Sequence, residues 1–217
     1  MTVSGRGERA AAAESIVRVC RRLYERGLIA GPDGNVSVRF PDGSILATPS
    51  GMSKVDVRPE DLVLVDPGGT LLEGSRRPSS ELQLHLRAYR CREDVNAVVH
   101  AHPPTATGFA VAGEGFTASV LPEVILQMGV VPLVPYATPG TEALADVCEP
   151  FLATHDAFLM ANHGATTLGM TLELAHQRME SLEHAARILL AARTLGRVNE
   201  LSAADAQALR DSLEESR

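Results

Sequence analysis

Three histidines in this chain have the spacing of a metal site. His100 and His102 are two residues apart at the end of an apolar run, and side chains two apart on a strand point to the same face of its sheet. His163 follows a second apolar run and precedes a glycine, which lets a backbone approach its neighbours closely. Three histidines with one open position are typical of catalytic zinc. The alternative is that the His-Ala-His pair is incidental, because so short a pattern is weakly specific. We expect the remaining histidines to be surface or half-buried residues: His85, His155, His176 and His184.

A second group of candidate residues lies in the segment Pro78-Ser79-Ser80-Glu81. Ser79 or Ser80 can cap a helix, with Glu81 in its first turn. The hydroxyls and free backbone N–H groups of such a helix start also bind phosphate. Glu81 would then stand beside the phosphate, as an acid/base catalyst or a metal ligand. Both the structural and the functional interpretation remain open from these residues alone.

Two glycine-containing turns, Gly34-Asn35 and Ser50-Gly51, offer further backbone donors. Lys54 follows the second turn and is the only lysine among the 20 basic residues. An enzyme that works through a Schiff base needs a lysine, so Lys54 would have to supply it. Lys54 itself lies outside the other candidate motifs.

The composition of the 217 residues is that of an ordinary globular protein, with 45% hydrophobic and 22% charged residues. A net charge of −7 and only 4% aromatic residues are not typical of a nucleic-acid binder, so we expect no nucleic-acid partner. No apolar run approaches the roughly 20 residues of a membrane helix, and the first residues lack an apolar signal core. Three widely spaced cysteines fit reduced thiols. We therefore expect no membrane association and a cytoplasmic location.

Alternating helix and strand patterns must position these residues. Helices are predicted over 10–27, 79–92, 141–151 and 171–195, with a last short helix from 202. Strands are predicted over 36–40, 44–48, 62–65, 95–99, 130–135 and 157–160, the first two forming a hairpin. Because the two kinds of element interleave, we predict one α/β domain over 1–217, with 1–9 and 197–217 peripheral.

Five motifs follow one another along the chain: Gly34-Asn35-Val36-Ser37, Thr48-Pro49-Ser50-Gly51, Ser79-Ser80-Glu81, His100-Ala101-His102-Pro103 and Asn162-His163-Gly164. Over nearly the whole chain this order resembles the zinc-dependent class II aldolases of the L-fuculose-1-phosphate aldolase type, in the aldolase/adducin superfamily. The resemblance implies a central, largely antiparallel β-sheet covered by helices on both sides. It also implies a C4 homotetramer with active sites at the subunit interfaces.

The resemblance implies roles for single residues as well. His100, His102 and His163 match the ligands of Zn²⁺, or of another divalent metal such as Mn²⁺ or Co²⁺. Glu81 matches the catalytic glutamate, which also binds the metal when substrate is absent. The positions that hold the substrate phosphate are matched by Gly34, Asn35, Ser50, Gly51, Ser79 and Ser80.

The implied substrate is a phosphorylated sugar, and the implied reaction is cleavage of a ketose 1-phosphate to dihydroxyacetone phosphate and an aldehyde through a metal-stabilised enediolate. The alternatives on the same site are a pentulose-phosphate 4-epimerase, a dehydratase of the methylthioribulose-phosphate type and a sugar-acid phosphate decarboxylase. A non-catalytic adducin-like scaffold is less favoured, because such domains lack the ligand histidines that are present here.

The chain departs from the fuculose-phosphate aldolase pattern at one point. The tyrosine that helps to protonate the leaving aldehyde has no counterpart between Ser119 and Gly129. Glu123 is the best substitute acid/base in that stretch. The equally weighted alternative is that Glu123 stabilises the start of a helix after Pro122.

Overall fold

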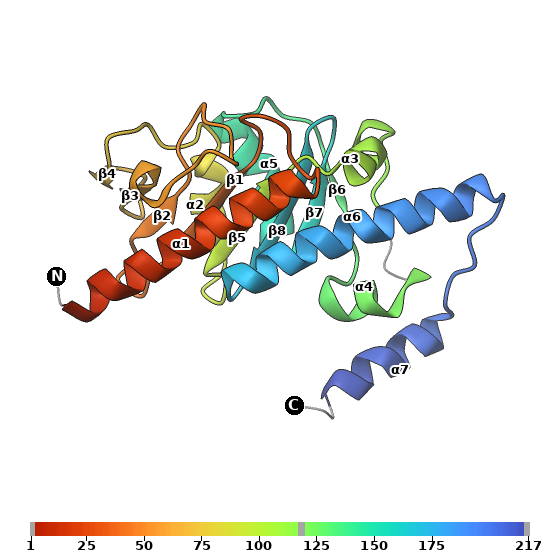
Figure 1. The fold of residues 1–217 in the computed structure, drawn as a ribbon. Helices are drawn as coiled ribbons and strands as arrows, with labels where there is room; N and C mark the ends of the chain where they lie inside the picture. The colour runs from red at the N-terminus through yellow and green to blue at the C-terminus, as the bar shows by residue number, and fades with distance from the viewer. Residues whose placement is uncertain (1–2, 117–119, 215–217) are drawn as a thin grey trace.

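The computed structural model describes residues 3–116 and 120–214. At its centre lies an eight-stranded sheet with the order β4-β3-β2-β1-β5-β8-β7-β6 (Figure 1). The strands are β1 Asn35–Arg39, β2 Ile45–Ala47, β3 Val63–Val65, β4 Leu71–Glu73, β5 Ala97–Ala101, β6 Leu133–Val134, β7 Ala157–Met160 and β8 Gly164–Gly169. Neighbouring strands are antiparallel except β6 and β7, which are parallel. The predicted largely antiparallel sheet is therefore confirmed.

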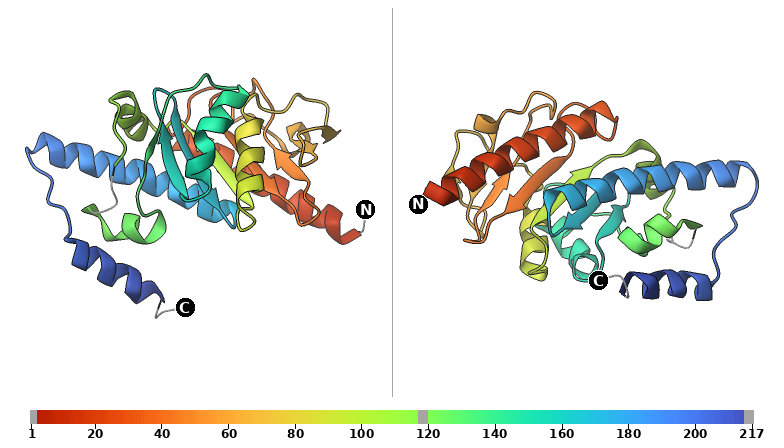
Figure 2. Two further views of the ribbon diagram at one scale, coloured as in Figure 1. Left: turned by 180° about the vertical axis from the view of Figure 1, so that it is seen from behind. Right: turned by 60° about the horizontal axis from the view of Figure 1, so that its bottom comes forward.

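Helices cover both faces of the sheet, as predicted. They are α1 Val3–Glu25, α2 Leu82–Cys91, α3 Pro104–Val111, α4 Pro122–Gln127, α5 Glu142–Leu152, α6 Leu172–Thr194 and α7 Ala203–Glu214, and a short 3-10 helix spans Pro59–Asp61. The long helices α1 and α6 lie side by side on one face, whereas α2 and α5 pack together on the other (Figures 1 and 2). Helix α7 stands apart from the sheet and packs against α4. The sheet thus has a hydrophobic core on each side.

The alternation of side chains along β5 decides which helices face the first two histidines. Ala97 and Val99 point into the core beneath α1 and α6. Val98 points to the opposite face, into the core that α2 and α5 cover. Because side chains on a strand alternate with a period of two, His100 shares the face of Val98. His100 therefore lies on the side of the sheet where α2 begins with Glu81.

The start of α2 differs from the prediction. Neither Ser79 nor Ser80 caps this helix, because the N-cap residue is Glu81, with φ −98° and ψ 11°. The hydroxyl of Ser79 instead accepts a hydrogen bond from the backbone N–H of Glu81 at 3.3 Å. The serines form a turn before the helix, and the side chain of Glu81 is left for other contacts.

Two elements beside the histidines have no counterpart in the predictions. Strand β8 is buried throughout but consists of glycine, alanine, threonine and a single leucine, so it lacks an apolar signal. Helix α3 follows Pro103 and has apolar residues without helical periodicity. The described residues contain no helix that could cross a membrane. The three cysteines form no disulfide, as expected.

Candidate active site

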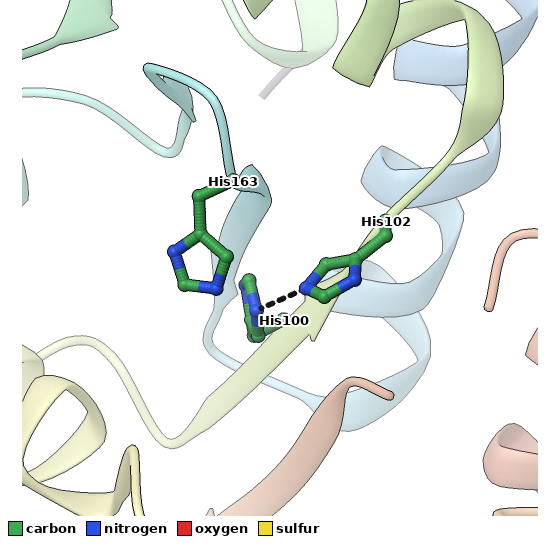
Figure 3. A group of neighbouring side chains, drawn as sticks. All are labelled: His100, His102 and His163. Atoms are coloured by element: carbon green, nitrogen blue, oxygen red, sulfur yellow. Dashed lines mark hydrogen bonds between the residues drawn. The ribbon is translucent and has the colours of Figure 1, made fainter. Parts of the chain in front are cut away.

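Three histidine side chains converge at one end of the sheet (Figure 3). His100 is the penultimate residue of β5, His102 directly follows this strand, and His163 lies in the turn between β7 and β8. The pairing of Ala101 with Ala165 brings this turn beside the end of β5. One nitrogen from each ring lies within 4.8 Å of the others, and the Nε2 atoms of His100 and His102 are 3.1 Å apart. The structure therefore forms the predicted cluster from the end of β5 and the turn between β7 and β8.

Hydrogen bonds behind the rings orient the histidines. Nδ1 of His100 lies 2.9 Å from the carbonyl oxygen of Ala165. A carbonyl oxygen only accepts, so Nδ1 carries a proton and the ring is turned with Nε2 towards the cluster. Nδ1 of His102 lies 3.5 Å from a carboxylate oxygen of Asp33. Such partners set the tautomer and orientation of metal-ligating histidines.

The surroundings of His102 favour its neutral form. Burial, with His100 and His163 nearby, lowers the pKa of His102 to about 4. His102 is therefore neutral at pH 7, which is the form that binds a metal ion.

The carboxylate of Glu81 faces two of these rings. Its Oε1 lies 3.0 Å from Nε2 of His163, and its Oε2 lies 3.2 Å from Nε2 of His100. Asn35 Nδ2 donates to Oε2 at 2.9 Å, because Asn35 pairs with His100 across β1 and β5. Burial alone would raise the pKa of Glu81, but His100 and His163 lower it below its usual range. Three imidazoles and a carboxylate are a donor set that fits a divalent metal such as zinc.

The backbone of the β7–β8 turn is adapted to this cluster. Asn162 has φ 56°, a left-handed conformation that asparagine tolerates better than most residues. A Cβ atom on Gly164 would lie 2.5 Å from Cδ2 of His102 and 2.6 Å from the carbonyl oxygen of Ala101. The glycine after His163 is therefore required by the close approach of another histidine.

A cavity of about 310 Å³ lies beside Glu81, His102 and His163. All of the residues predicted to hold phosphate line it: Gly34, Asn35, Ser50, Gly51, Ser79 and Ser80. Two of the contributing loops are joined, because the backbone N–H of Ser50 donates to the carbonyl oxygen of Arg77 at 2.9 Å. The structure thus brings these residues together, and their role in phosphate binding stays a prediction.

Lys54 lines the same cavity, although the sequence placed it outside the motifs. It is only 2% exposed, and its Nζ donates to the carbonyl oxygens of Pro32 and Met52 at 2.7 and 3.0 Å. Burial lowers the pKa of its ammonium group. Its position after a turn has no periodic signal, so its status as the only lysine was the sole indication that could have drawn attention to it.

Glu123 lies elsewhere in the chain. It occupies the first turn of α4 after Pro122, so the helix expected from the structural interpretation is present. Its side chain lines a different cavity, together with Gln127, Ser181 and His184. Within one chain the structure does not bring Glu123 to the histidine cluster.

A buried carboxylate on α6 supports the segment that follows His102. Pro103 is the N-cap residue of α3 and makes no side-chain cap. Glu183, which is 3% exposed, accepts hydrogen bonds from the backbone N–H groups of Thr105 and Ala106 at 3.0 and 2.9 Å. A carboxylate at a helix N-terminus is favourable because it meets the positive end of the helix dipole. The long helix α6 thereby anchors the chain just beyond one candidate ligand.

A buried polar network lies between α2 and β1. The hydroxyl of Ser37 is 2.6 Å from Nδ1 of His85 and 2.7 Å from the hydroxyl of Tyr89. His85 is only 1% exposed, so the expectation of a surface or half-buried residue was wrong, as it also was for His176 on α6, which is 2% exposed. Burial, with a contribution from His100, lowers the pKa of His85 to about 3. This histidine is neutral in the folded protein at pH 7.

The fold and the donor set together are those of an α/β protein with a candidate metal site. The family model of the class II aldolase and adducin N-terminal domain matches residues 14–190. The chain belongs to this family, as the order of its motifs indicated.

Relatives of the chain include decarboxylases and aldolases of sugar phosphates. The 3-oxo-tetronate 4-phosphate decarboxylase of Escherichia coli K12 is 36% identical over 180 residues, which cover 81% of this chain and 84% of that protein. The 5-deoxy-D-ribulose 1-phosphate aldolase of Bacillus thuringiensis serovar kurstaki is 35% identical over 185 residues, covering 84% and 86%. Among solved structures, an L-fuculose 1-phosphate aldolase matches with a TM-score of 0.87 at 30% identity, covering 93% of this chain and 95% of that one.

Proposed function

We propose that this protein is a metal-dependent lyase that cleaves a carbon–carbon bond of a sugar phosphate. The first candidate reaction is aldol cleavage of a ketose 1-phosphate to dihydroxyacetone phosphate and an aldehyde. The observation that carries the proposal is the carboxylate of Glu81 between His100 and His163, at the wall of a cavity lined by hydroxyls and glycines. A divalent metal held by His100, His102 and His163 would supply Lewis-acid stabilisation of the negative charge that develops on the substrate.

Glu81 is the candidate acid/base. After cleavage, the enediolate carbon of the product must take up a proton. Asn35 Nδ2 donates to Oε2 of Glu81 at 2.9 Å, while Oε1 faces His163, so both oxygens of the carboxylate are positioned by neighbours. A positioned carboxyl group that transfers a proton contributes about 10²- to 10⁴-fold to a rate.

The phosphate group of the substrate would occupy the cavity beside Glu81. Ser50, Gly51, Ser79 and Ser80 line it and offer hydroxyl and backbone N–H donors. Neutral donors suit a site where a metal ion is the largest local charge.

Decarboxylation of a 3-oxo sugar-acid phosphate is the second candidate reaction. It is supported by the 36% identity to a decarboxylase of such a substrate. It is also supported by the lack of a tyrosine between Ser119 and Gly129. Aldol cleavage must move a proton at the oxygen of the departing aldehyde, whereas the release of CO₂ has no such step.

We also propose a homotetramer with active sites at its subunit interfaces, to which Glu123 of a neighbouring copy contributes. Apolar side chains exposed near the end of α6 and just after it support an interface there, with Leu190 51% and Leu195 86% exposed. Mixing two inactive variants, Glu81→Gln and Glu123→Gln, should then restore part of the activity, because mixed assemblies contain intact sites. Activity that does not return, in variants that still assemble, would contradict a shared site.

The decisive assay offers the zinc-loaded protein a panel of ketose 1-phosphates and 3-oxo sugar-acid phosphates. Release of an aldehyde identifies the aldolase, and release of CO₂ identifies the decarboxylase. Glu81→Gln should retain bound zinc but lose proton exchange at the enediolate carbon of dihydroxyacetone phosphate. A variant that exchanges this proton as fast as the wild type would refute the role of Glu81.

A further inference from the structure

The only lysine of the chain is the only lysine or arginine that lines the proposed phosphate cavity, among the residues that the structure describes. Two arginines precede the serine motif. Arg76 points elsewhere, because its Nε pairs with Asp61 at 2.7 Å, and Arg77 is exposed and does not line the cavity. Among the described residues, Lys54 is thus the only lysine or arginine side chain in the wall of this cavity. Lys54 is only 2% exposed. Burying a charged group lowers the stability of the fold unless the charge is well paired, so the position of Lys54 needs a physical reason.

Lys54 joins two loops of the cavity. Its backbone N–H donates to the carbonyl oxygen of Gly31 at 3.3 Å, and its Nζ donates to that of Pro32 at 2.7 Å. Nζ also donates to the carbonyl oxygen of Met52 at 3.0 Å. One loop leads into Asp33 and Asn35, which contact His102 and Glu81, and the other contains the Ser50-Gly51 turn. The side chain of Lys54 therefore links the loop beside the candidate metal ligands to the loop that contains the Ser50-Gly51 turn.

The hydrogen bonds of Lys54 leave part of its charge uncompensated. Its Nζ donates to two neutral carbonyl oxygens, whereas an ammonium group has three donors. The carboxylates that face this cavity, Asp33 and Glu81, would repel an entering phosphate dianion. A fixed cation in the wall offsets that repulsion, and charge-assisted hydrogen bonds to phosphate are about twice as strong as neutral ones.

We propose that Lys54 is a specificity-determining residue for the substrate phosphate: its ammonium group is the cationic partner of the dianion and fixes the two loops that surround it. This inference rests on the proposed function, because it takes the cavity to be the phosphate site. It assigns Lys54 no role as a Schiff-base nucleophile, since Nζ is already engaged with two carbonyl oxygens.

The single lysine makes a direct experiment possible without any substitution. Protein labelled with ¹³C-lysine has one Cε signal, which reports on Lys54 alone. Zinc-loaded protein is titrated with inorganic phosphate at pH 8, and the Cε signal is followed together with the backbone amide signals of Ser50 and Gly51. We expect all three to shift with one dissociation constant.

The failures of the two proposals are distinguishable in this titration. If the amide signals of Ser50 and Gly51 shift but the Lys54 signal does not, the role of Lys54 is refuted and the phosphate site stands. If none of the signals shifts, the phosphate site of the proposed function is refuted, and the role of Lys54 with it.

Substitutions separate the charge from the loop contacts. Lys54→Met removes both, whereas Lys54→Gln keeps a hydrogen-bond donor and removes the charge. We expect each to weaken the binding of inorganic phosphate about tenfold or more, as the loss of a hydrogen bond to a charged group implies. Arg90→Met, which removes one positive charge from the exposed end of α2, is the matched control and should bind phosphate as the wild type does.

Zinc content and the melting temperature are measured for each variant, so that a folding defect is recognised. If Lys54→Gln folds, retains zinc and binds phosphate as tightly as the wild type, the inference is overturned. It is also overturned if Arg90→Met weakens binding as strongly as Lys54→Gln, because the effect would then be one of overall charge. The labelled wild-type protein decides the question even if both Lys54 variants fail to fold.

Discussion

Replacing Gly164 with alanine should damage the candidate metal site through a single methyl group. The added Cβ would lie 2.5 Å from Cδ2 of His102 and 2.6 Å from the carbonyl oxygen of Ala101. The backbone of Gly164 is not in the left-handed region, so alanine could adopt its conformation and the effect is steric alone. One neighbour is main chain and cannot rotate away, so the β7–β8 turn and His102 must separate.

The size of the effect follows from these distances. Ordinary carbon contacts begin near 3.5 Å, so the neighbours must move apart by about 1 Å. Metal–ligand distances vary by only about 0.2 Å from their usual values. An extra methyl group in a packed site costs about 1–3 kcal/mol of stability. If this cost falls on the metal-bound geometry, zinc affinity should fall about tenfold to a hundredfold.

Competition with a chromophoric chelator measures the zinc affinity of Gly164→Ala, and thermal unfolding measures its stability. Gly108→Ala is the matched control, because its Cβ would meet nothing within 4 Å in helix α3. That variant should bind zinc normally and gain about 0.5–1 kcal/mol from helix propensity. A Gly164→Ala protein with wild-type zinc affinity would refute the steric reasoning and the proximity of His102 to the turn.

Three further changes test other parts of the structure. His163→Ala should abolish zinc binding measured by metal analysis after dialysis, and full metal retention would exclude His163 as a ligand. Glu183→Ala should cost about 1–3 kcal/mol in chemical denaturation, because it leaves the N–H groups of Thr105 and Ala106, the second of them buried, without their acceptor, and should weaken zinc binding through His102. The pKa of His85 is about 3 in the folded protein and about 6.5 when unfolded, so the unfolded state binds more protons and stability falls as the pH is lowered from about 6.5 towards 3. His85→Phe should flatten this part of the melting-temperature profile, and an unchanged slope would contradict the buried neutral histidine.

Local sequence patterns predicted much of the framework. The hairpin of β1 and β2 was predicted because its alternating segments flank a Pro-Asp-Gly turn, and both strands lie within one residue of their expected bounds. Helix α6 was predicted because its apolar residues repeat with helical spacing; the structure adds that Thr171 caps its start. These features depend on residues close together in the chain, so the local pattern carries the information.

Other elements could not be predicted, because their stability comes from distant partners. Strand β8 has little apolar character of its own and is held between β5 and β7. The cap of α3 comes from Glu183, which lies 78 residues after Thr105. Burial of His85 depends on how α2 packs over β1, and no local pattern indicates that packing.

The sequence by itself determined the chemistry that is available. It identified three histidines, a glutamate and several donor-rich turns, and their order along the chain indicated the family that the comparison confirmed. Only the tertiary structure decided which of these groups meet. It brought Glu81 between His100 and His163, left Glu123 in a separate cavity, and placed Lys54 in the wall of the proposed phosphate site. The physical reason is that residue types and their order are local facts, whereas the distance between two side chains depends on strand register and helix packing, which bring together residues far apart in the chain.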